Sequence, residues 1–181
     1  MIKMTTTIPN LIFQEETNEC GLACVAMLAQ TQGQPVSLAT LREWFPASDH
    51  GTSLDTLMSI LARLGIAPTP VLFEHDELSD LPLPAILHYG ASHYVLLAWR
   101  KGNHVCVMNP AIGEQWLPFA ALKQEISGYA LIVEPEQAVA ADPDLPLSTT
   151  AQSAPRAMSM QETAAVPGIY RLMLLPFLVS L

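Results

Sequence analysis

The spacing of apolar residues changes near Ala67, and this change limits the folds that are open to the chain. Before Ala67, three segments carry apolar residues at helical intervals; after it, short apolar runs are separated by Pro and Gly. Helices followed by strands, rather than alternating with them, are typical of the α+β class. We therefore expect an α+β fold in which N-terminal helices pack on a mostly antiparallel β-sheet.

The first helical segment lies in QEETNECGLACVAML, residues 14–28. Its apolar residues recur at i, i+3, i+4, i+7 and i+8, the pattern of one helix face. This pattern predicts a helix that begins between Asn18 and Cys20 and ends before Gly33. Two more helices are predicted in SLATLREWF and GTSLDTLMSILARLG, because each has a Ser or Thr near its start and an apolar stripe. The stripe of the first helix contains Cys20, Ala23, Cys24, Met27 and Leu28.

Short apolar runs follow the helices as far as residue 134, and together they predict the sheet. They are TPVLF, PAILHY, HYVLLAW, HVCVMNP, EQWLPF and YALIVE. Beyond them the composition changes, so we assign residues 1–135 to one domain and the Ala-, Pro-, Ser- and Thr-rich residues 136–167 to a linker. Residues 168–181 are apolar but fewer than the roughly 20 that a membrane helix needs. They are either the start of a truncated transmembrane helix or a short docking or membrane-surface segment.

Charge and cysteine content exclude some functions. The formal net charge is −9 with only eight Lys and Arg, so we do not expect a nucleic-acid partner, because phosphate binding needs clustered basic side chains. Three cysteines cannot all pair, and the N-terminus lacks the apolar core of a signal peptide. These features predict a reducing, cytoplasmic compartment.

The two cysteines of the first helix differ in their expected chemistry. Cys20 lies at the helix N-terminus, where the macrodipole and the unpaired N–H groups favour thiolate, whereas Cys24 lies one turn inside. The carboxylates of Glu15, Glu16 and Glu19 oppose this effect. Cys20 therefore needs a nearby base to act as a nucleophile. Cys24 and Cys106 are interpreted as small buried apolar residues.

His93 is the histidine best placed to be that base, because it opens the predicted strand HYVLLAW, which a short turn joins to HVCVMNP. If residues 100–102 form a three-residue loop with Gly102 in the left-handed region, Trp99 pairs with Asn103. Counting outward from this pair places Asn109 directly across from His93, near enough to hold the ring. A two-residue turn would put the two side chains on opposite faces.

The chain thus offers Cys20, His93 and Asn109 in the order and residue types of papain-like proteases. Gln14 adds an amide donor upstream of the cysteine, and such a donor can stabilise the oxyanion of a tetrahedral intermediate. No metal or cofactor is expected. The spacing of Cys20 and Cys24 is neither a C-x-x-C redox motif nor a typical zinc-ligand pair, and no second cluster completes a metal site.

Four stretches, QEETNECGLACVAML, GTSLDTLMSILARLG, PAILHYGASHYVLLAW and VMNPAIG, resemble the bacteriocin-processing cysteine peptidases. These are the N-terminal domains of ABC exporters that cleave double-glycine leader peptides, and the resemblance covers about residues 8 to 134. It implies a papain-like fold with Gln14 as oxyanion donor, Cys20 as nucleophile and His93 as general base. Asn109 stands where that family usually has aspartate, which implies a weaker Cys–His ion pair.

The resemblance also implies partners and a location. The partners are the leader peptide of a precursor and the transmembrane and ATPase parts of an ABC exporter, in cis beyond this chain or in trans. The location is the cytoplasmic side of the bacterial inner membrane. No Gly-Lys dipeptide occurs, so a P-loop ATPase would lie outside these 181 residues.

Three alternatives remain open at this stage. The first is a degenerate peptidase-like domain that binds exporter cargo without cleaving it. The second is redox or metal chemistry by Cys20, Cys24 and a histidine. The third is a thiol hydrolase of another kind, such as an amidase on the same fold.

Overall fold

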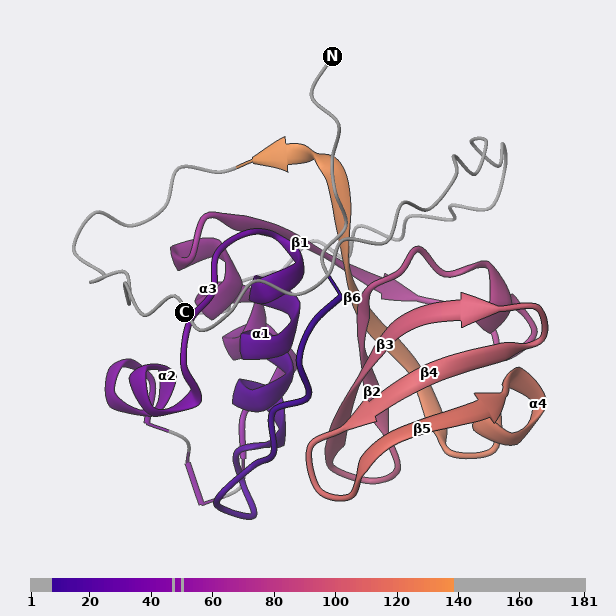
Figure 1. Ribbon diagram of the computed structural model, residues 1–181, viewed down its shortest axis with the longest axis horizontal. Coiled ribbons are helices and arrows are strands. Elements are labelled where there is room, and N and C mark those ends of the chain that lie inside the picture. The colour runs from indigo at the N-terminus through magenta and orange to yellow at the C-terminus, as the bar shows by residue number, and fades with distance from the viewer. Residues whose placement is uncertain (1–7, 47, 50, 139–181) are drawn as a thin grey trace, which may run out of the picture.

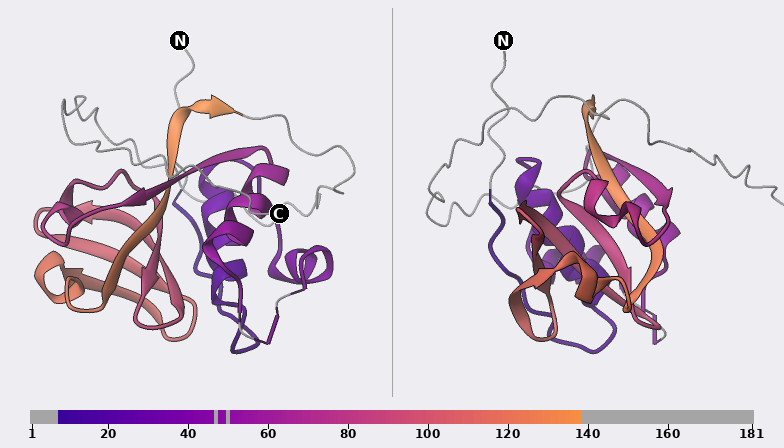
Figure 2. Two further views of the ribbon diagram at one scale, coloured as in Figure 1. Left: turned by 180° about the vertical axis from the view of Figure 1, so that it is seen from behind. Right: turned by 90° about the vertical axis from the view of Figure 1, so that its right-hand side faces the viewer.

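The computed structural model describes residues 8–46, 48–49 and 51–138 of the chain. Three helices come first, and six strands form one antiparallel sheet in the order β1-β6-β2-β3-β4-β5. The helices gather on one side of the sheet (Figures 1 and 2). This arrangement confirms the predicted order of helices and strands. The helices are α1 (Cys20–Thr31), α2 (Leu38–Trp44) and α3 (Leu54–Arg63); the strands are β1 (Ile66–Leu72), β2 (Ala85–Tyr89), β3 (His93–Lys101), β4 (His104–Asn109), β5 (Gly113–Pro118) and β6 (Ile126–Ala138).

Helix α1 is buried on every side, which goes beyond the single apolar face that its sequence pattern predicts. All residues from Cys20 to Ala29 are buried. The helix packs against β2 and β3 of the sheet and against α2 and α3. Its small residues allow this close contact: a Cβ added at Gly21 would lie 2.9 Å from a methyl group of Leu57. Cys20 is therefore held at the end of the most enclosed helix.

Hydroxyl side chains begin the other two long helices, as their sequences predict. Ser37 accepts a hydrogen bond from the backbone N–H of Thr40, and Ser53 accepts one from that of Thr56. Each satisfies a backbone donor that the first helical turn leaves without an intrahelical partner. Gly65, with φ +77°, follows α3 and leads the chain into β1.

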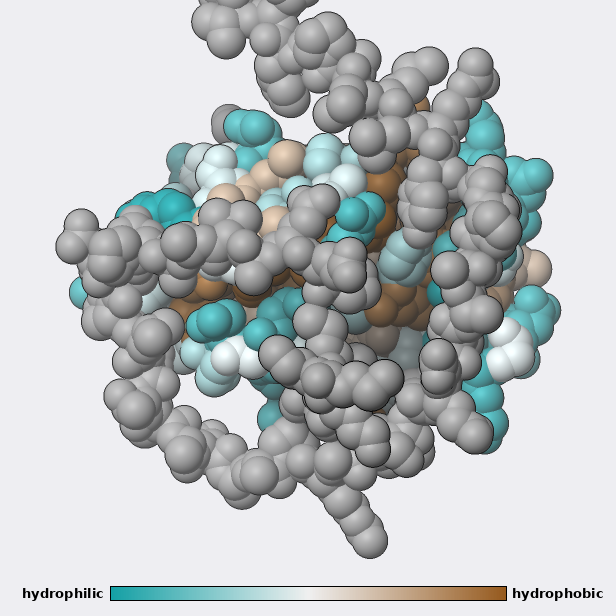
Figure 3. Space-filling view, turned by 90° about the horizontal axis from the view of Figure 1, so that it is seen from above, coloured by the Kyte–Doolittle hydropathy of each residue, from teal (hydrophilic) through white to brown (hydrophobic). Residues whose placement is uncertain are grey.

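Two hydrophobic clusters lie on the two faces of the sheet. The larger one joins α1, α2 and α3 to alternate residues of β2, β3 and β4, such as Ile86, Leu96 and Met108. The smaller one lies on the other face, under the 3₁₀ helix η1 (Glu77–Asp80) and the one-turn helix α4 (Phe119–Leu122). On the face seen from above, most of the apolar residues that are visible lie toward the centre, and hydrophilic residues lie mainly along the margin (Figure 3).

The predicted domain boundary at residue 135 falls inside β6, which continues to Ala138. The remainder of the predicted linker 136–167 and the apolar segment 168–181 lie outside the described residues. Within the part of the chain that is described, no helix has both the length and the apolar character needed to cross a bilayer.

Candidate active site

Cys20 is the first residue of α1, and its side chain is almost enclosed, with 4% of its surface exposed. The residue before it, Glu19, occupies the N-cap position but makes no side-chain cap hydrogen bond to the helix. The first N–H groups of α1 are therefore not covered by that carboxylate. A thiolate at Cys20 benefits from these donors and from the positive end of the helix dipole.

His93 begins β3 and Asn109 ends β4, and their side chains meet. The Nε2 atom of His93 lies 2.8 Å from Oδ1 of Asn109. The same Oδ1 accepts a hydrogen bond from the backbone N–H of Ala111 at 3.0 Å, which identifies this atom as the acceptor. Nε2 of His93 is therefore the donor, and Nδ1 is left for the thiol of Cys20.

The pKa shifts of the two residues favour an ion pair. Burial acts to raise the pKa of the Cys20 thiol, but hydrogen bonds from His93 and from the Tyr94 backbone bring this pKa below its ordinary value. The hydrogen bond with Cys20 raises the pKa of His93, against the effect of burial, and Asn109 adds to the increase. Thiolate and imidazolium therefore stabilise each other, which is the state that a cysteine nucleophile requires.

The predicted turn between β3 and β4 was wrong. Lys101 pairs with His104, so the turn contains two residues, Gly102 and Asn103, rather than the predicted 100–102. Gly102 has φ +56°, as expected, and stands at the first central position, the glycine position of a type II′ turn. With a regular ladder, this shorter turn would place the side chains at 93 and 109 on opposite faces.

A β-bulge at Ala98 restores the shared face. Leu97 pairs with Val107 and Trp99 with Cys106, so Ala98 is an extra residue in β3. An extra residue shifts the alternation of side chains by one, which cancels the effect of the shorter turn. Asn109 is consequently diagonal to His93 rather than directly across from it, a separation that these side chains can span.

Gln14 lies in the segment that precedes α1 and is fixed to the turn after β4. Its backbone N–H donates to the carbonyl of Pro110 at 3.0 Å. Its side-chain Nε2 donates to the carbonyls of Glu16 and Thr17 at 3.1 and 3.2 Å, whereas its buried Oε1 accepts no hydrogen bond. The side-chain nitrogen has two N–H groups, and these two carbonyls are acceptors enough for both of them.

Other cysteines and histidines have different surroundings. All three cysteines are free, and burial raises the pKa of Cys24 and brings that of Cys106 to about 12. Both thiols are therefore poor nucleophiles. His88 contacts the hydroxyl of Ser127 at 2.8 Å, and His75 faces the carbonyl of Ile126. Across the described ranges, no three His, Cys, Asp or Glu side chains are arranged to hold a metal ion.

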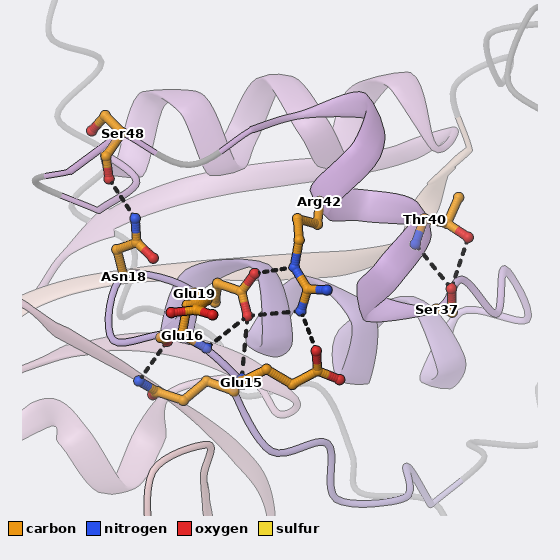
Figure 4. A network of polar contacts seen from close by, with 9 residues as sticks. Glu15, Glu16, Asn18, Glu19, Ser37, Thr40, Arg42 and Ser48 are labelled. Atoms are coloured by element: carbon orange, nitrogen blue, oxygen red, sulfur yellow. Dashed lines mark hydrogen bonds and ion pairs between the residues drawn. The ribbon is translucent and has the colours of Figure 1, made fainter.

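Sequence reasoning missed Arg42, which lies on α2 and binds the carboxylate of Glu19 (Figure 4). The sequence suggests only that Glu19 opposes ionisation of Cys20. Arg42 is 23 residues away in an amphipathic helix, so no local pattern indicates the contact. A buried carboxylate nevertheless needs a cation as partner. The carboxylate next to the predicted nucleophile was therefore the one feature of the sequence that could have prompted a search for such a cation.

The comparison with protein families and sequences gives a consistent result. The model of the peptidase C39 family matches residues 9–138. The colicin V secretion/processing ATP-binding protein of Escherichia coli is 38% identical over 125 residues, which are 69% of this chain and 18% of that protein. The chain thus spans less than a fifth of the length of this relative.

Solved structures confirm the expected α+β, papain-like fold. A double glycine motif protease from an AMS/PCAT transporter, in complex with the leader peptide, has a TM-score of 0.66 at 24% identity, covering 74% of this chain and 96% of that one. The peptidase domain of Streptococcus ComA, a bi-functional ABC transporter, has a TM-score of 0.62 at 24% identity, covering 70% and 98%. With a family model that matches most of its length, the chain belongs to the peptidase C39 family.

Proposed function

We propose that the described domain is a cysteine endopeptidase that removes double-glycine-type leader peptides from bacteriocin-like or other secreted peptide precursors. One observation carries the proposal: the thiol at the start of α1 shares a hydrogen bond with His93, whose Nε2 is held by Asn109. This arrangement, in a chain of the C39 family, supports Cys20 as nucleophile, His93 as general base and Asn109 as the residue that orients the ring.

The reaction proposed for these residues is acyl transfer to sulfur. The Cys20 thiolate attacks the carbonyl carbon of the second residue of a Gly-Gly or Gly-Ala pair, and the carbonyl oxygen becomes an oxyanion. The imidazolium of His93 then donates its proton to the nitrogen of the departing amine, and the C–N bond breaks. Water, deprotonated by His93, hydrolyses the thioester and releases the leader.

The oxyanion requires donors, and we assign one of them to Gln14. Its Nε2 carries two N–H groups, which have the carbonyls of Glu16 and Thr17 as acceptors when no substrate is bound. In the proposed role, one of these bonds is exchanged for a bond to the oxyanion, whose negative charge the amide stabilises more than the neutral carbonyl of the substrate. The role predicts an effect on turnover rather than on leader affinity.

The leader is expected to bind as an amphipathic helix in an apolar groove, with only its C-terminal end extended at Cys20. Glycine at the cleavage site suits an enclosed thiol, because a residue without Cβ allows the backbone to approach closely. A C39 neighbour of similar fold was solved with its leader peptide. The names of the relatives include secretion and ATP-binding functions. We therefore place the domain on the cytoplasmic side of the inner membrane, with the transmembrane and ATPase parts of an ABC exporter as partners, in cis or in trans.

Cleavage of a synthetic precursor tests the proposal. The purified chain is mixed with peptides that carry an amphipathic leader ending in Gly-Gly or Gly-Ala, and the products are weighed by mass spectrometry. Cys20→Ala should abolish cleavage and leave leader binding within a few-fold. Cys24→Ala is the matched control and should retain most activity, because it removes only a buried sulfur at a cost of about 1 kcal/mol.

Two results would contradict the assignment. Equal loss of activity in the two variants would exclude a single nucleophile at Cys20. Leader binding without cleavage by the wild-type chain would favour the cargo-binding alternative, against which the lowered pKa of Cys20 and the raised pKa of His93 argue. Hydrolysis of small amides in preference to leaders would favour an amidase.

A further inference from the structure

Glu19 is a buried carboxylate directly before the proposed nucleophile, and only 2% of its surface is exposed. Its side chain turns back along the chain: Oε2 accepts hydrogen bonds from the backbone N–H groups of Glu15 at 3.2 Å and Glu16 at 3.0 Å (Figure 4). An acidic residue at an N-cap usually accepts from the helix that follows. Glu19 instead binds the segment that carries Gln14.

Arg42 holds the carboxylate in this orientation from α2. Its Nε donates to Oε1 of Glu19, its Nη2 donates to Oε2 at 3.0 Å, and Nη2 also lies 2.7 Å from the carboxylate of Glu15. The guanidinium thus binds Glu19 through both oxygens, the geometry in which arginine fixes a carboxylate most firmly. The hydrogen bond with Arg42 is also the main reason that the pKa of Glu19 lies below its ordinary value.

Two further hydrogen bonds join residues within the turn formed by residues 14–20. The backbone N–H of Glu19 donates to the carbonyl of Glu16 at 3.2 Å, and the side chain of Gln14 donates to that same carbonyl. The carboxylate of Glu19 and the amide of Gln14 therefore bind neighbouring backbone groups of one turn. We therefore expect a change at Glu19 to alter the position of the Gln14 side chain through this turn.

We propose that Glu19 and Arg42 are a positioning pair for the reaction at Cys20. The pair keeps residues 14–20 in one conformation, so that the amide of Gln14 keeps its place relative to the sulfur. It also holds the negative charge of Glu19 away from the start of α1 and compensates it with the guanidinium. The proposal rests on the roles given to Cys20 and Gln14 under the proposed function.

Replacing either member should lower kcat, but only the replacement of Arg42 should raise the thiol pKa of Cys20. Both Glu19→Gln and Arg42→Met loosen the turn, so both should lower kcat, by about tenfold, with KM changed less than about twofold. Arg42→Met leaves the charge of Glu19 uncompensated and should raise the apparent thiol pKa of Cys20 by about half a pH unit. Glu19→Gln removes that charge and should not raise it.

The pH dependence of alkylation by iodoacetamide reports that thiol pKa without any peptide substrate. His93 and Tyr94 of β3 and Cys24 of α1 are the titratable groups coupled to Cys20, and they are unchanged in the variants, so a shift of the midpoint reports the altered charge of the Glu19–Arg42 pair. Cys24 and Cys106 are buried, and Cys20→Ala gives the background labelling. Lys101→Gln, at the exposed far end of β3, is the control for the loss of one positive charge and should match the wild type.

The outcomes separate the inference from the proposed function. Lower kcat in both variants, with an alkylation midpoint that rises in Arg42→Met and does not rise in Glu19→Gln, supports the positioning pair. An unchanged kcat in both folded variants, or an equal upward shift in Lys101→Gln, overturns it. If Arg42→Met does not fold, Arg42→Lys is tested instead. Lysine keeps the positive charge but cannot bind both carboxylate oxygens of Glu19 as the guanidinium does, so kcat should fall while the alkylation midpoint stays the same. An unchanged kcat in this variant overturns the proposal. Failure of the wild type to cleave any leader would instead refute the proposed function, and the alkylation profiles would still report the pair.

Discussion

Replacing Asn109 by aspartate adds a negative charge at the atom that holds the His93 ring. The geometry needs no rearrangement, because Oδ1 already accepts from Nε2 of His93 at 2.8 Å and from the backbone N–H of Ala111 at 3.0 Å. A carboxylate accepts both bonds equally well. The substitution therefore changes the charge next to the imidazolium and leaves the shape of the site as it is.

The size of the effect follows from the distance and the burial. Unit charges about 4 Å apart attract by about 4 kcal/mol at an effective dielectric constant of about 20. Part of this is offset because position 109 is only 6% exposed, and burying a carboxylate there has its own cost. We expect a net increase in the pKa of His93 of about 1 to 2 pH units. Asn109→Asp should then preserve or raise activity.

The assay is the pH profile of kcat/KM for a leader-bearing peptide, accompanied by alkylation of Cys20. The alkaline limb reports loss of the His93 proton, so it should move to higher pH by about 1 unit or more in Asn109→Asp. Gln115→Glu is the matched control, because it adds the same charge at an exposed position of the adjacent strand β5 and should leave the limb in place.

Two results would refute this reasoning. An alkaline limb that stays in place or moves to lower pH would show that position 109 does not stabilise the imidazolium. Asn109→Ala should lower activity by freeing the ring to rotate, though less severely than loss of Cys20, and unchanged kinetics in that variant would reduce the site to a Cys–His dyad.

Three further predictions concern the residues around the site and the sheet. Gln14→Ala should lower kcat by about 100-fold with little change in leader affinity; a loss of affinity alone would make Gln14 a binding contact. Gly128→Ala should destabilise the fold by about 2 to 3 kcal/mol in urea unfolding, because Gly128 has φ +86° and an added Cβ would lie 2.9 Å from the carbonyl of Phe73, whereas Gly33→Ala, at φ +72° with open space, should cost about 1 kcal/mol. Folding lowers the pKa of Glu19, so its contribution to stability is complete above the unfolded value of about 4.3 and is lost as pH falls through the folded value. Urea midpoints measured between about pH 5 and pH 2 should therefore fall less in Glu19→Gln than in the wild type, and parallel curves would contradict this.

The elements with strong periodicity could be predicted from the sequence. The start of α1, the hydroxyl caps of α2 and α3 and the six strands all follow from local patterns. The one-turn helices η1 and α4 could not be predicted, because four residues are too few to show a period. The burial of α1 on all sides depends on which elements pack around the helix, and the sequence of the helix itself does not predict those neighbours.

The contact between His93 and Asn109 was predicted through a turn that the structure does not have. Two deviations cancel: the turn is one residue shorter, and the bulge at Ala98 adds one residue to β3. Nothing local marks Ala98, because alanine beside Trp99 is compatible with a regular strand. The partnership of Glu19 with Arg42 was equally hidden, since it depends on how α2 packs beside the start of α1.

Because α1 is enclosed and the turn before it is exposed, the backbone amides of these two parts of the site should exchange with solvent at different rates. The amides of Ala23 to Leu28 are hydrogen-bonded within a helix that is buried on every side, so they should exchange only when the whole domain unfolds. The turn at Glu15 to Thr17 is exposed and should exchange through local opening. Cys20 thus lies at the start of the helix whose amides exchange most slowly, whereas Gln14 lies next to a turn whose amides exchange faster. A bound peptide should therefore slow exchange in the turn while the rates in α1 stay the same.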